Sequence, residues 1–153
     1  MLNTAAAITF AATLPALLVA HNVADHWGQS TPQAMSKQKR SHEGRRACAT
    51  HVVIYTVFTA ATVALLWAVL GLPISLTGFV VGQLVSAVTH YWADRGHTLA
   101  ALAALLGQTD FLRLGAPRPG RDDNPVLGTG RYALDQSWHW LWLLVAALIT
   151  AVA

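Results

Sequence analysis

The chain has 153 residues, of which 54% are hydrophobic and only 11% are charged. Because soluble domains carry about 25% charged residues, this composition argues against a water-soluble domain and favours an integral membrane protein. The length predicts a single transmembrane domain, residues 1–153. The single cysteine, Cys48, excludes an intramolecular disulfide. The net charge of +3 is small and membrane topology accounts for its placement, so we expect no nucleic acid as a partner.

The first apolar run, residues 4–24, is long enough to cross a bilayer, which takes about 20 residues. A cleaved signal peptide is the alternative. A signal peptide begins with a basic segment, whereas the first basic residue here is Lys37. Cleavage near residue 20 would also separate His21 from the helix that it ends. We therefore predict an uncleaved transmembrane helix.

Three further apolar runs cover residues 51–70, 74–93 and about 133–153. Gly71 and Pro73 provide a tight connection between the first two of these runs, so the two helices should form an antiparallel hairpin. Residues 98–107 form a shorter segment rich in Ala and Leu, which is expected to lie on the membrane surface as a helix. Residues 115–130, rich in Pro and Gly, are expected to form a loop. The predicted fold is therefore an all-α, integral membrane four-helix bundle.

The ten Lys and Arg side chains all lie in residues 37–46 and 95–131. With four spans, both segments fall on the same side of the membrane, and the positive-inside rule makes that side cytoplasmic. Both termini are then outside. The sequence therefore predicts a multi-pass protein of the bacterial inner (cytoplasmic) membrane. Membrane lipids are its expected partners, and a homo-oligomer is compatible with the sequence.

A His-x-x-Ala-Asp motif occurs twice, at residues 21–25 and 90–94, each time at the end of an apolar run. Asp135 and His139 have the same spacing in reverse order, and His51 begins the remaining run. Residues four apart lie on one face of a helix. In the predicted topology all these side chains reach one depth at the cytoplasmic end of the bundle. The seven candidate metal ligands are His21, Asp25, His51, His90, Asp94, Asp135 and His139.

Each His–Asp pair taken alone is explained well as a hydrogen-bonded couple, or as polar residues at a helix end among the headgroups. The convergence of three pairs and His51 favours a shared metal site or a proton-handling site. An Asp at the centre of a bilayer costs about 2.5–3.5 kcal/mol, and a bound cation would offset both that cost and the repulsion between carboxylates. The His and Asp donors suit zinc, iron or manganese, as one or two divalent ions.

Three further side chains are candidates for orienting the ligands. Gln29 and Gln136 follow the motifs closely and could hydrogen-bond to the ligands. Arg95 follows Asp94 and could pair with it or with a lipid phosphate. Among the ligands themselves, the strongest candidates are Asp25, His90, Asp94 and His139.

The motifs follow a recognisable order along the chain. The first helix ends His21-x-x-x-Asp25 with Gln29 nearby, His51 opens the second, the third ends His90-x-x-x-Asp94, and the last opens Asp135-Gln136-x-x-His139. This order resembles a widespread bacterial family of small four-helix membrane proteins that is known as a domain of unknown function. The resemblance covers nearly the whole chain. It implies the four-helix membrane fold and no particular activity.

The leading functional hypothesis is a membrane-embedded, metal-dependent hydrolase, in which a metal lowers the pKa of bound water and an Asp or His acts as general base. A site among the cytoplasmic headgroups favours a lipid-like or phosphate-bearing substrate. The alternative is a non-enzymatic membrane protein that uses the cluster structurally: a metal or proton sensor, a transporter component or a partner-binding scaffold. Transport is disfavoured because the outer halves of the apolar runs are nearly all Ala, Leu and Val.

Overall fold

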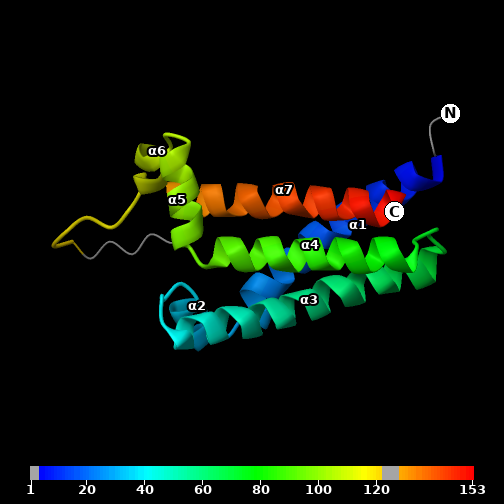
Figure 1. Cartoon of the computed structure of the whole chain (residues 1–153), viewed down its shortest axis with the longest axis horizontal. Helices are drawn as coiled ribbons and strands as arrows, with labels where there is room; N and C mark the ends of the chain where they lie inside the picture. Colours follow the sequence, from blue (N-terminus) through cyan, green and yellow to red (C-terminus); the bar gives the residue numbers. More distant parts are fainter. Residues whose placement is uncertain (1–3, 122–127) are drawn as a thin grey trace.

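The computed structural model describes residues 4–121 and 128–153, and every regular element in that part of the chain is a helix (Figure 1). The predicted all-α fold is therefore confirmed. Residues 122–127 of the predicted loop lie outside the described part. The long helices are α1 (Thr4–Val23), α3 (His42–Leu70), α4 (Leu76–Asp94) and α7 (Gly130–Val152). The shorter elements are η1 (Ala24–Gly28), α2 (Thr31–Ser36), α5 (His97–Leu105) and α6 (Thr109–Arg113).

Hydroxyl caps determine where the long helices begin. The Ser41 hydroxyl accepts a hydrogen bond from the Gly44 amide at 3.2 Å, and the Thr129 hydroxyl accepts one from the Tyr132 amide at 3.1 Å. The Ser41 cap starts α3 well before His51, where the apolar run begins. The polar segment between the first two apolar runs is therefore partly helical, and it contains α2 and the first turns of α3.

A tight connection joins α3 to α4. Gly71 ends α3 with a φ of 60°, in the left-handed region that glycine adopts without strain. α4 then runs back beside α3, as predicted for the hairpin (Figure 1). α4 also packs closely on α7, because a Cβ at Gly82 would clash with the Thr150 hydroxyl and lie 3.0 Å from the Ala146 carbonyl oxygen. This close approach sets the polar residues at the end of α4 against those at the start of α7.

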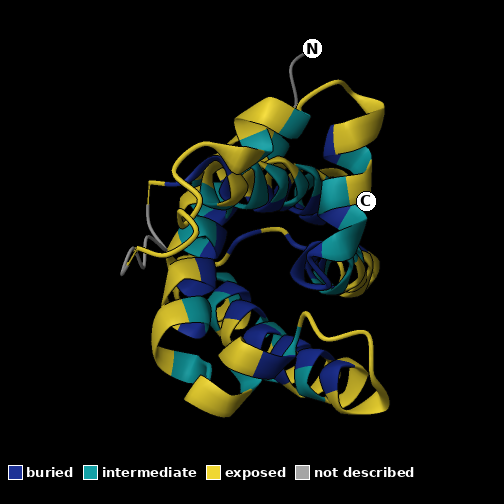
Figure 2. Cartoon of the chain, turned by 90° about the vertical axis from the view of Figure 1, so that its left-hand side faces the viewer, coloured by how far each residue is buried: buried dark blue, intermediate teal, exposed yellow. Residues whose placement is uncertain are grey.

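Buried residues face the inside of the bundle, as the end-on view in Figure 2 shows. Around the α3–α4 turn the interior is apolar, and its core comprises Leu17, Val63, Leu72, Ile74, Leu143, Ala146 and Ala147. Toward the other end the interior becomes polar. His21, His51, His90 and His139 are each at most 3% exposed. The bundle therefore has one mostly apolar end, with a few buried threonines, and one end with a buried polar cluster.

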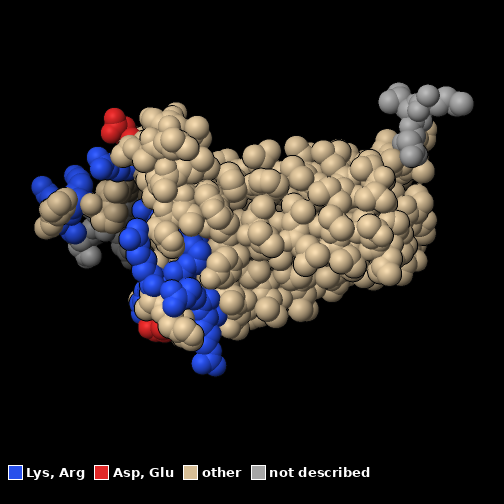
Figure 3. Space-filling model, in the orientation of Figure 1, with Lys and Arg blue, Asp and Glu red and all other residues tan. Residues whose placement is uncertain are grey.

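The outer faces of the long helices carry large, exposed apolar side chains, among them Val19, Val53, Leu65, Val88 and Val152. Lys and Arg gather at the end of the molecule that carries α2, α5 and α6, which we call the basic end (Figure 3). α1 begins and α7 ends at the opposite end (Figure 1). Two helical segments, Thr4–Gly28 and His42–Leu70, are long and apolar enough to cross a membrane.

Candidate metal centre

The seven predicted ligands lie together near the basic end, and all four long helices contribute. α1 and the π-helical turn η1 supply His21 and Asp25, α3 supplies His51, α4 supplies His90 and Asp94, and α7 supplies Asp135 and His139. Their donor atoms form three overlapping groups, each within 4.8 Å: His21, Asp25 and His90; His51, His90 and Asp94; and Asp94, Asp135 and His139. Because the groups share members, they form one cluster.

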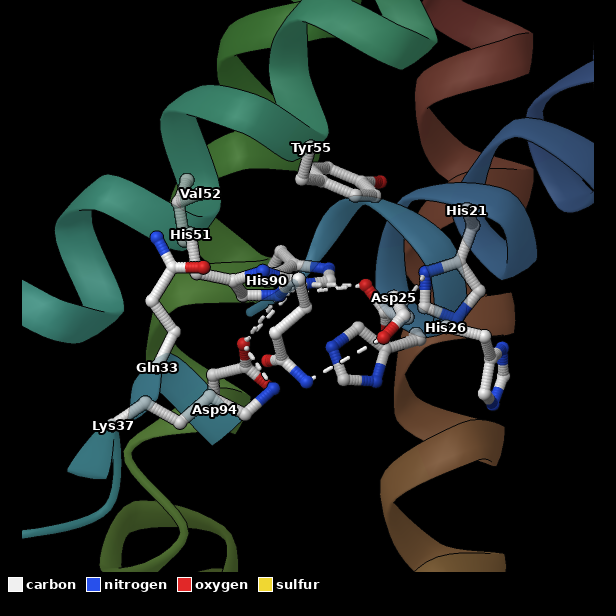
Figure 4. A network of polar contacts seen from close by, with 12 residues as sticks. His21, Asp25, His26, Gln33, Lys37, His51, Val52, Tyr55, His90 and Asp94 are labelled. Atoms are coloured by element: carbon white, nitrogen blue, oxygen red, sulfur yellow. Dashed lines mark hydrogen bonds and ion pairs between the residues drawn. The ribbon is translucent and has the colours of Figure 1, made fainter. Parts of the chain in front are cut away.

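Four side chains of the cluster point toward one another in Figure 4, and their nearest atoms form what we call the four-atom set. The set comprises His51 Nε2, His90 Nε2, Asp25 Oδ1 and Asp94 Oδ2. The two nitrogens lie 3.1 Å apart. Each nitrogen lies 3.1–3.5 Å from both carboxylate oxygens. Of the four ligands that the sequence favoured most, three belong to this set, and His51 takes the place expected for His139.

The spacing of the four-atom set matches the coordination shell of a first-row divalent metal. Bonds of about 2.0–2.2 Å place tetrahedral ligand atoms about 3.3–3.6 Å apart, and neighbouring octahedral ligand atoms about 2.8–3.1 Å apart. The observed separations of 3.1–3.5 Å lie between the upper end of the octahedral range and the tetrahedral range. The donor set therefore fits zinc, and it equally fits iron or manganese with open positions.

The hydrogen bonding of these side chains is incomplete without a cation. Asp25 Oδ1, a member of the four-atom set, is buried and has no hydrogen-bond partner among the described residues. The Nε2 atoms of the two rings face each other, so at most one proton can lie on the line between them. Buried polar atoms without partners are rare and indicate a missing ion or water. A cation within the four-atom set would use both nitrogen lone pairs.

The charges of the cluster also favour a divalent cation. The cluster contains three carboxylates, and Lys37 places its Nζ atom 2.9 Å from Asp94 Oδ2. With neutral imidazoles, three negative charges and one positive charge leave a net charge of −2. Buried charge is costly unless it is compensated. One divalent cation would therefore neutralise the group.

Lys37 is a member of the site that the sequence did not indicate. Its side chain is 13% exposed, and that of Asp94 is 4% exposed. Burial lowers the pKa of the Lys37 ammonium, but attraction to Asp94 and Asp25 outweighs this effect, so the pKa lies above its ordinary value of 10.5. Lys37 is therefore a permanent cation at neutral pH and touches one oxygen of the four-atom set.

Arg95 holds the segment that carries Lys37. Its guanidinium donates to the main-chain carbonyls of Lys37 and Lys39, both at 2.5 Å. Arg95 is only 6% exposed, so it lies inside the protein and not at the lipid surface. The structure thus gives Arg95 main-chain partners in place of the Asp94 carboxylate or lipid phosphate considered from the sequence. Its role is to position Lys37.

His21 and His139 supply donors beside the four-atom set. The Nδ1–H of His139 donates to the Asp135 carbonyl at 2.8 Å, so its buried Nε2 carries the lone pair and has no partner among the described residues. The Nε2–H of His21 donates to Gln136 Oε1 at 3.4 Å, which leaves its Nδ1 lone pair 3.6 Å from Asp25 Oδ2. These free lone pairs could bind a second ion.

The two glutamines chosen from the sequence contact the cluster in different ways. Gln136 accepts from His21, and its amide nitrogen donates to Asp135 Oδ2 at 3.3 Å. Gln136 therefore orients a ring and a carboxylate together. Gln29 donates to the main-chain carbonyl of Asp25 at 3.4 Å. It supports the backbone of η1 and not the carboxylate, and π-helical turns of this kind are frequent at functional sites.

Tyr55 closes the cluster on its inner side. Its ring stacks on that of His90 with centroids 3.9 Å apart, and its hydroxyl lies 2.6 Å from Ser86 Oγ. One turn further along α3, the Thr59 hydroxyl donates to Gln83 Oε1 at 2.8 Å. The sequence does contain the signal for these residues, because Tyr55 and Thr59 continue the face of α3 that His51 begins.

A polar pocket of about 260 Å³ leads to the cluster at the basic end. Its lining includes two carboxylates of the cluster, Asp94 and Asp135, together with Lys37 and Arg131. The Asp135 side chain is 26% exposed, so this carboxylate faces the pocket more openly than the other two. The cluster is therefore reachable from one side, through a passage with both cationic and anionic walls.

The fold and the cluster define a class of protein: a small all-helical chain whose long helices bring buried His and Asp side chains together at one basic end. The chain belongs to the family described as "Protein of unknown function (DUF3307)", which matches residues 13–153. The predicted resemblance to a family of unknown function is thereby confirmed. The matched range includes all seven cluster residues. No curated protein and no solved structure matches the chain.

Proposed function

We propose that all four long helices span a bacterial inner membrane, with the basic end in the cytoplasm and both termini outside. The two apolar segments, the exposed apolar faces and the collection of Lys and Arg at one end support this topology. The test uses a Cys48→Ala background with Gln38→Cys or Ala153→Cys. An impermeant maleimide added to intact cells should label residue 153 alone. Labelling of residue 38 alone would reverse the topology.

Within this bundle, the cluster binds a divalent transition metal, with His51, His90, Asp25 and Asp94 as ligands of the first ion. The single observation that carries this proposal is the 3.1–3.5 Å spacing of the four-atom set. A second ion would lie among Asp94, Asp135 and His139, whose donor atoms lie within 4.8 Å of one another. The choice among zinc, iron and manganese follows from coordination number, since tetrahedral zinc would use all four donors and an octahedral ion would keep open positions.

The reaction that fits this site is hydrolysis of a lipid-like or phosphate-bearing substrate. When bound, the metal supplies a polarising charge and a water of lowered pKa. In the site with one ion, Asp135 is the candidate general base, because it lines the pocket and lies outside the four-atom set. Lys37 and Arg131 line the same pocket and can hold an anionic group beside the cluster.

Elemental analysis of the purified protein tests metal binding. The expected result is one or two equivalents of a transition metal, lost in His90→Ala and retained in His26→Ala. His26 is a matched control, because it is an exposed histidine whose one hydrogen bond to the described residues is with the main-chain carbonyl of Asn22. A protein that binds no zinc, iron or manganese after reconstitution would refute the metal centre. A loaded protein that hydrolyses no phosphoester or lipid would refute the hydrolase alone.

A second function, metal or proton transport, is favoured by one specific observation. Buried polar side chains continue from the cluster toward the opposite end of the bundle, through the Tyr55–Ser86 and Thr59–Gln83 contacts. Beyond them, Thr9 and Thr13 on α1 are fully buried, and their hydroxyls have no partner among the described residues. This interior is more polar than the sequence led us to expect. Flux into proteoliposomes that disappears in Gln83→Leu, with metal content unchanged, would favour transport over hydrolysis.

A further inference from the structure

A second pocket lies directly beside the polar one. It is an apolar groove of about 300 Å³ between α7 and the short helix α5 with the turn that follows it. Its apolar lining includes the side chains of Leu99, Leu102, Leu106, Leu134, Trp138 and Leu141. The groove lies at the basic end but contains no charged residue in its lining. It thus differs in chemistry from the pocket that reaches the cluster.

The two pockets share a wall. Leu99 of α5 lines both of them. On α7, Arg131 and Asp135 face the polar pocket, whereas Leu134 and Trp138 face the apolar groove. Because these residues alternate within the first two turns of one helix, the pockets lie on adjacent faces of α7. A single molecule with a polar head and an apolar chain could fill both.

Charge complementarity indicates the nature of the head. Arg131 is exposed and forms no ion pair with the described residues, although Lys37 is paired with Asp94. An anionic group in the polar pocket would therefore meet a guanidinium that is still available, close to the carboxylates of the cluster. Arg recognises phosphate well, because its planar donors match two phosphate oxygens.

The surroundings indicate that the chain of this molecule comes from a membrane. Trp138 of the groove stacks on Trp92 of α4, with ring centroids 4.5 Å apart. Trp side chains are enriched at the level of the lipid headgroups, where their rings are partly in contact with water. On the proposed topology the groove lies at that level, next to the apolar outer faces of the long helices. A lipid could then enter it sideways without leaving the bilayer.

We infer that the two pockets form one binding site for a membrane lipid with a phosphate-bearing head, whose phosphate lies by Arg131 and whose hydrocarbon chain lies in the groove. This inference rests on the topology of the proposed function and names the substrate class of its site. Its two recognition elements, Arg131 and the groove, lie outside the cluster, although Asp94 and Asp135 line the same polar pocket. Lipid binding and metal binding can therefore be tested separately.

The experiment is photo-crosslinking in phosphatidylcholine nanodiscs. The probes are phosphatidic acid and phosphatidylcholine with a diazirine on one acyl chain, and labelled peptides are located by mass spectrometry. The expected result is labelling of residues 99–106 and 134–141, about fivefold stronger for phosphatidic acid than for phosphatidylcholine, as for one partly exposed charge contact. Arg131→Gln should remove this preference. Metal content is measured on the same samples.

A pair of tryptophan variants tests the groove. Ser137 lines the groove and is exposed, so Ser137→Trp fills the groove without disturbing the core. Leu148 is exposed on the same helix outside the groove, so Leu148→Trp is the matched control. Ser137→Trp should abolish labelling of the groove, and Leu148→Trp should leave it unchanged.

Three outcomes would overturn the inference. Equal labelling by the two probes would show that the head is not recognised. Labelling spread evenly over the outer faces of α3 and α4 would show that the groove binds no lipid. Loss of the preference in millimolar inorganic phosphate, with no effect of Ser137→Trp, would identify free phosphate as the ligand. A protein with metal but without groove labelling refutes this inference alone, and labelling without metal refutes the metal centre alone.

Discussion

Replacement of Lys37 by methionine is the most direct test of how the negative charge of the cluster is compensated. Lys37 and Asp94 form an ion pair at 2.9 Å with side chains only 13% and 4% exposed. Lys37→Met keeps the length of the side chain and removes its charge. Breaking a buried pair costs about 3–5 kcal/mol, because the other charge stays buried without a partner. The small exposure of Lys37 favours the lower value, about 3 kcal/mol.

The assay is thermal unfolding in detergent, with and without metal. In the metal-free protein a loss of about 3 kcal/mol should lower the midpoint by about 6–12 °C. A bound metal would compensate part of the charge that Asp94 carries without Lys37. The difference in unfolding midpoint between wild type and Lys37→Met should therefore be smaller in the metal-loaded protein. Lys39→Met is the control. Lys39 pairs with Glu43 at 3.4 Å, but both side chains are more than half exposed, so the expected change is below about 1 kcal/mol.

Equal midpoints for Lys37→Met and Lys39→Met in the metal-free protein would refute the reasoning. The reasoning would also be refuted if metal did not reduce the loss in unfolding midpoint of Lys37→Met. In the first case Asp94 would not depend on the ammonium, and in the second the metal would not share its carboxylate.

Four further outcomes are expected. The pKa of Lys37 is raised in the folded protein, so its contribution to the free energy of unfolding is complete below about pH 10.5 and is lost only above it. The stability difference between wild type and Lys37→Met should therefore stay constant from pH 7 to 9 in unfolding scans. A change in that window would contradict the view that Lys37 is permanently charged. Gln136→Ala should leave the first metal equivalent bound and weaken any second one by about 10–100-fold in calorimetric titrations, because Gln136 contacts ligands outside the four-atom set. Gly82→Val should lower both the midpoint and the metal content, since the added atoms clash with α7; normal values for both would show that α4 and α7 need not approach so closely. Tyr55→Phe should retain the metal and cost about 1 kcal/mol, the value of its hydrogen bond to Ser86, and loss of the metal would instead make the hydroxyl part of the site.

The convergence of the cluster could be predicted from the sequence because it depends on two local regularities. The spacing of four residues places His90 and Asp94 on one helix face, and the lengths of the apolar runs place the motifs near one end of the molecule. Both follow from helix geometry and hydropathy. The same spacing of four residues also predicts that Tyr55 and Thr59 lie on the face of α3 that contains His51.

The position of Lys37 could not be predicted in this way. It depends on a short segment between α2 and α3 that has no hydrophobic period. That segment is held by Arg95 through main-chain carbonyls, which every residue has, so no residue pattern marks the contact. The choice of His51 over His139 in the four-atom set is likewise beyond the sequence, because it depends on how far each helix end enters the bundle.

The ion pair between Lys37 and Asp94 has a consequence for biogenesis. In many small metalloproteins folding depends on the metal, because the site exists only in the folded chain and the free energy of metal binding contributes to folding. Here an amine of the protein itself already neutralises one of the ligand carboxylates. On the proposed topology and metal centre, the newly made chain would pack with a net charge of −2 in the cluster and not −3, so it would depend less on metal while it folds. On this proposal, metal would be loaded after folding, as a separate and reversible step.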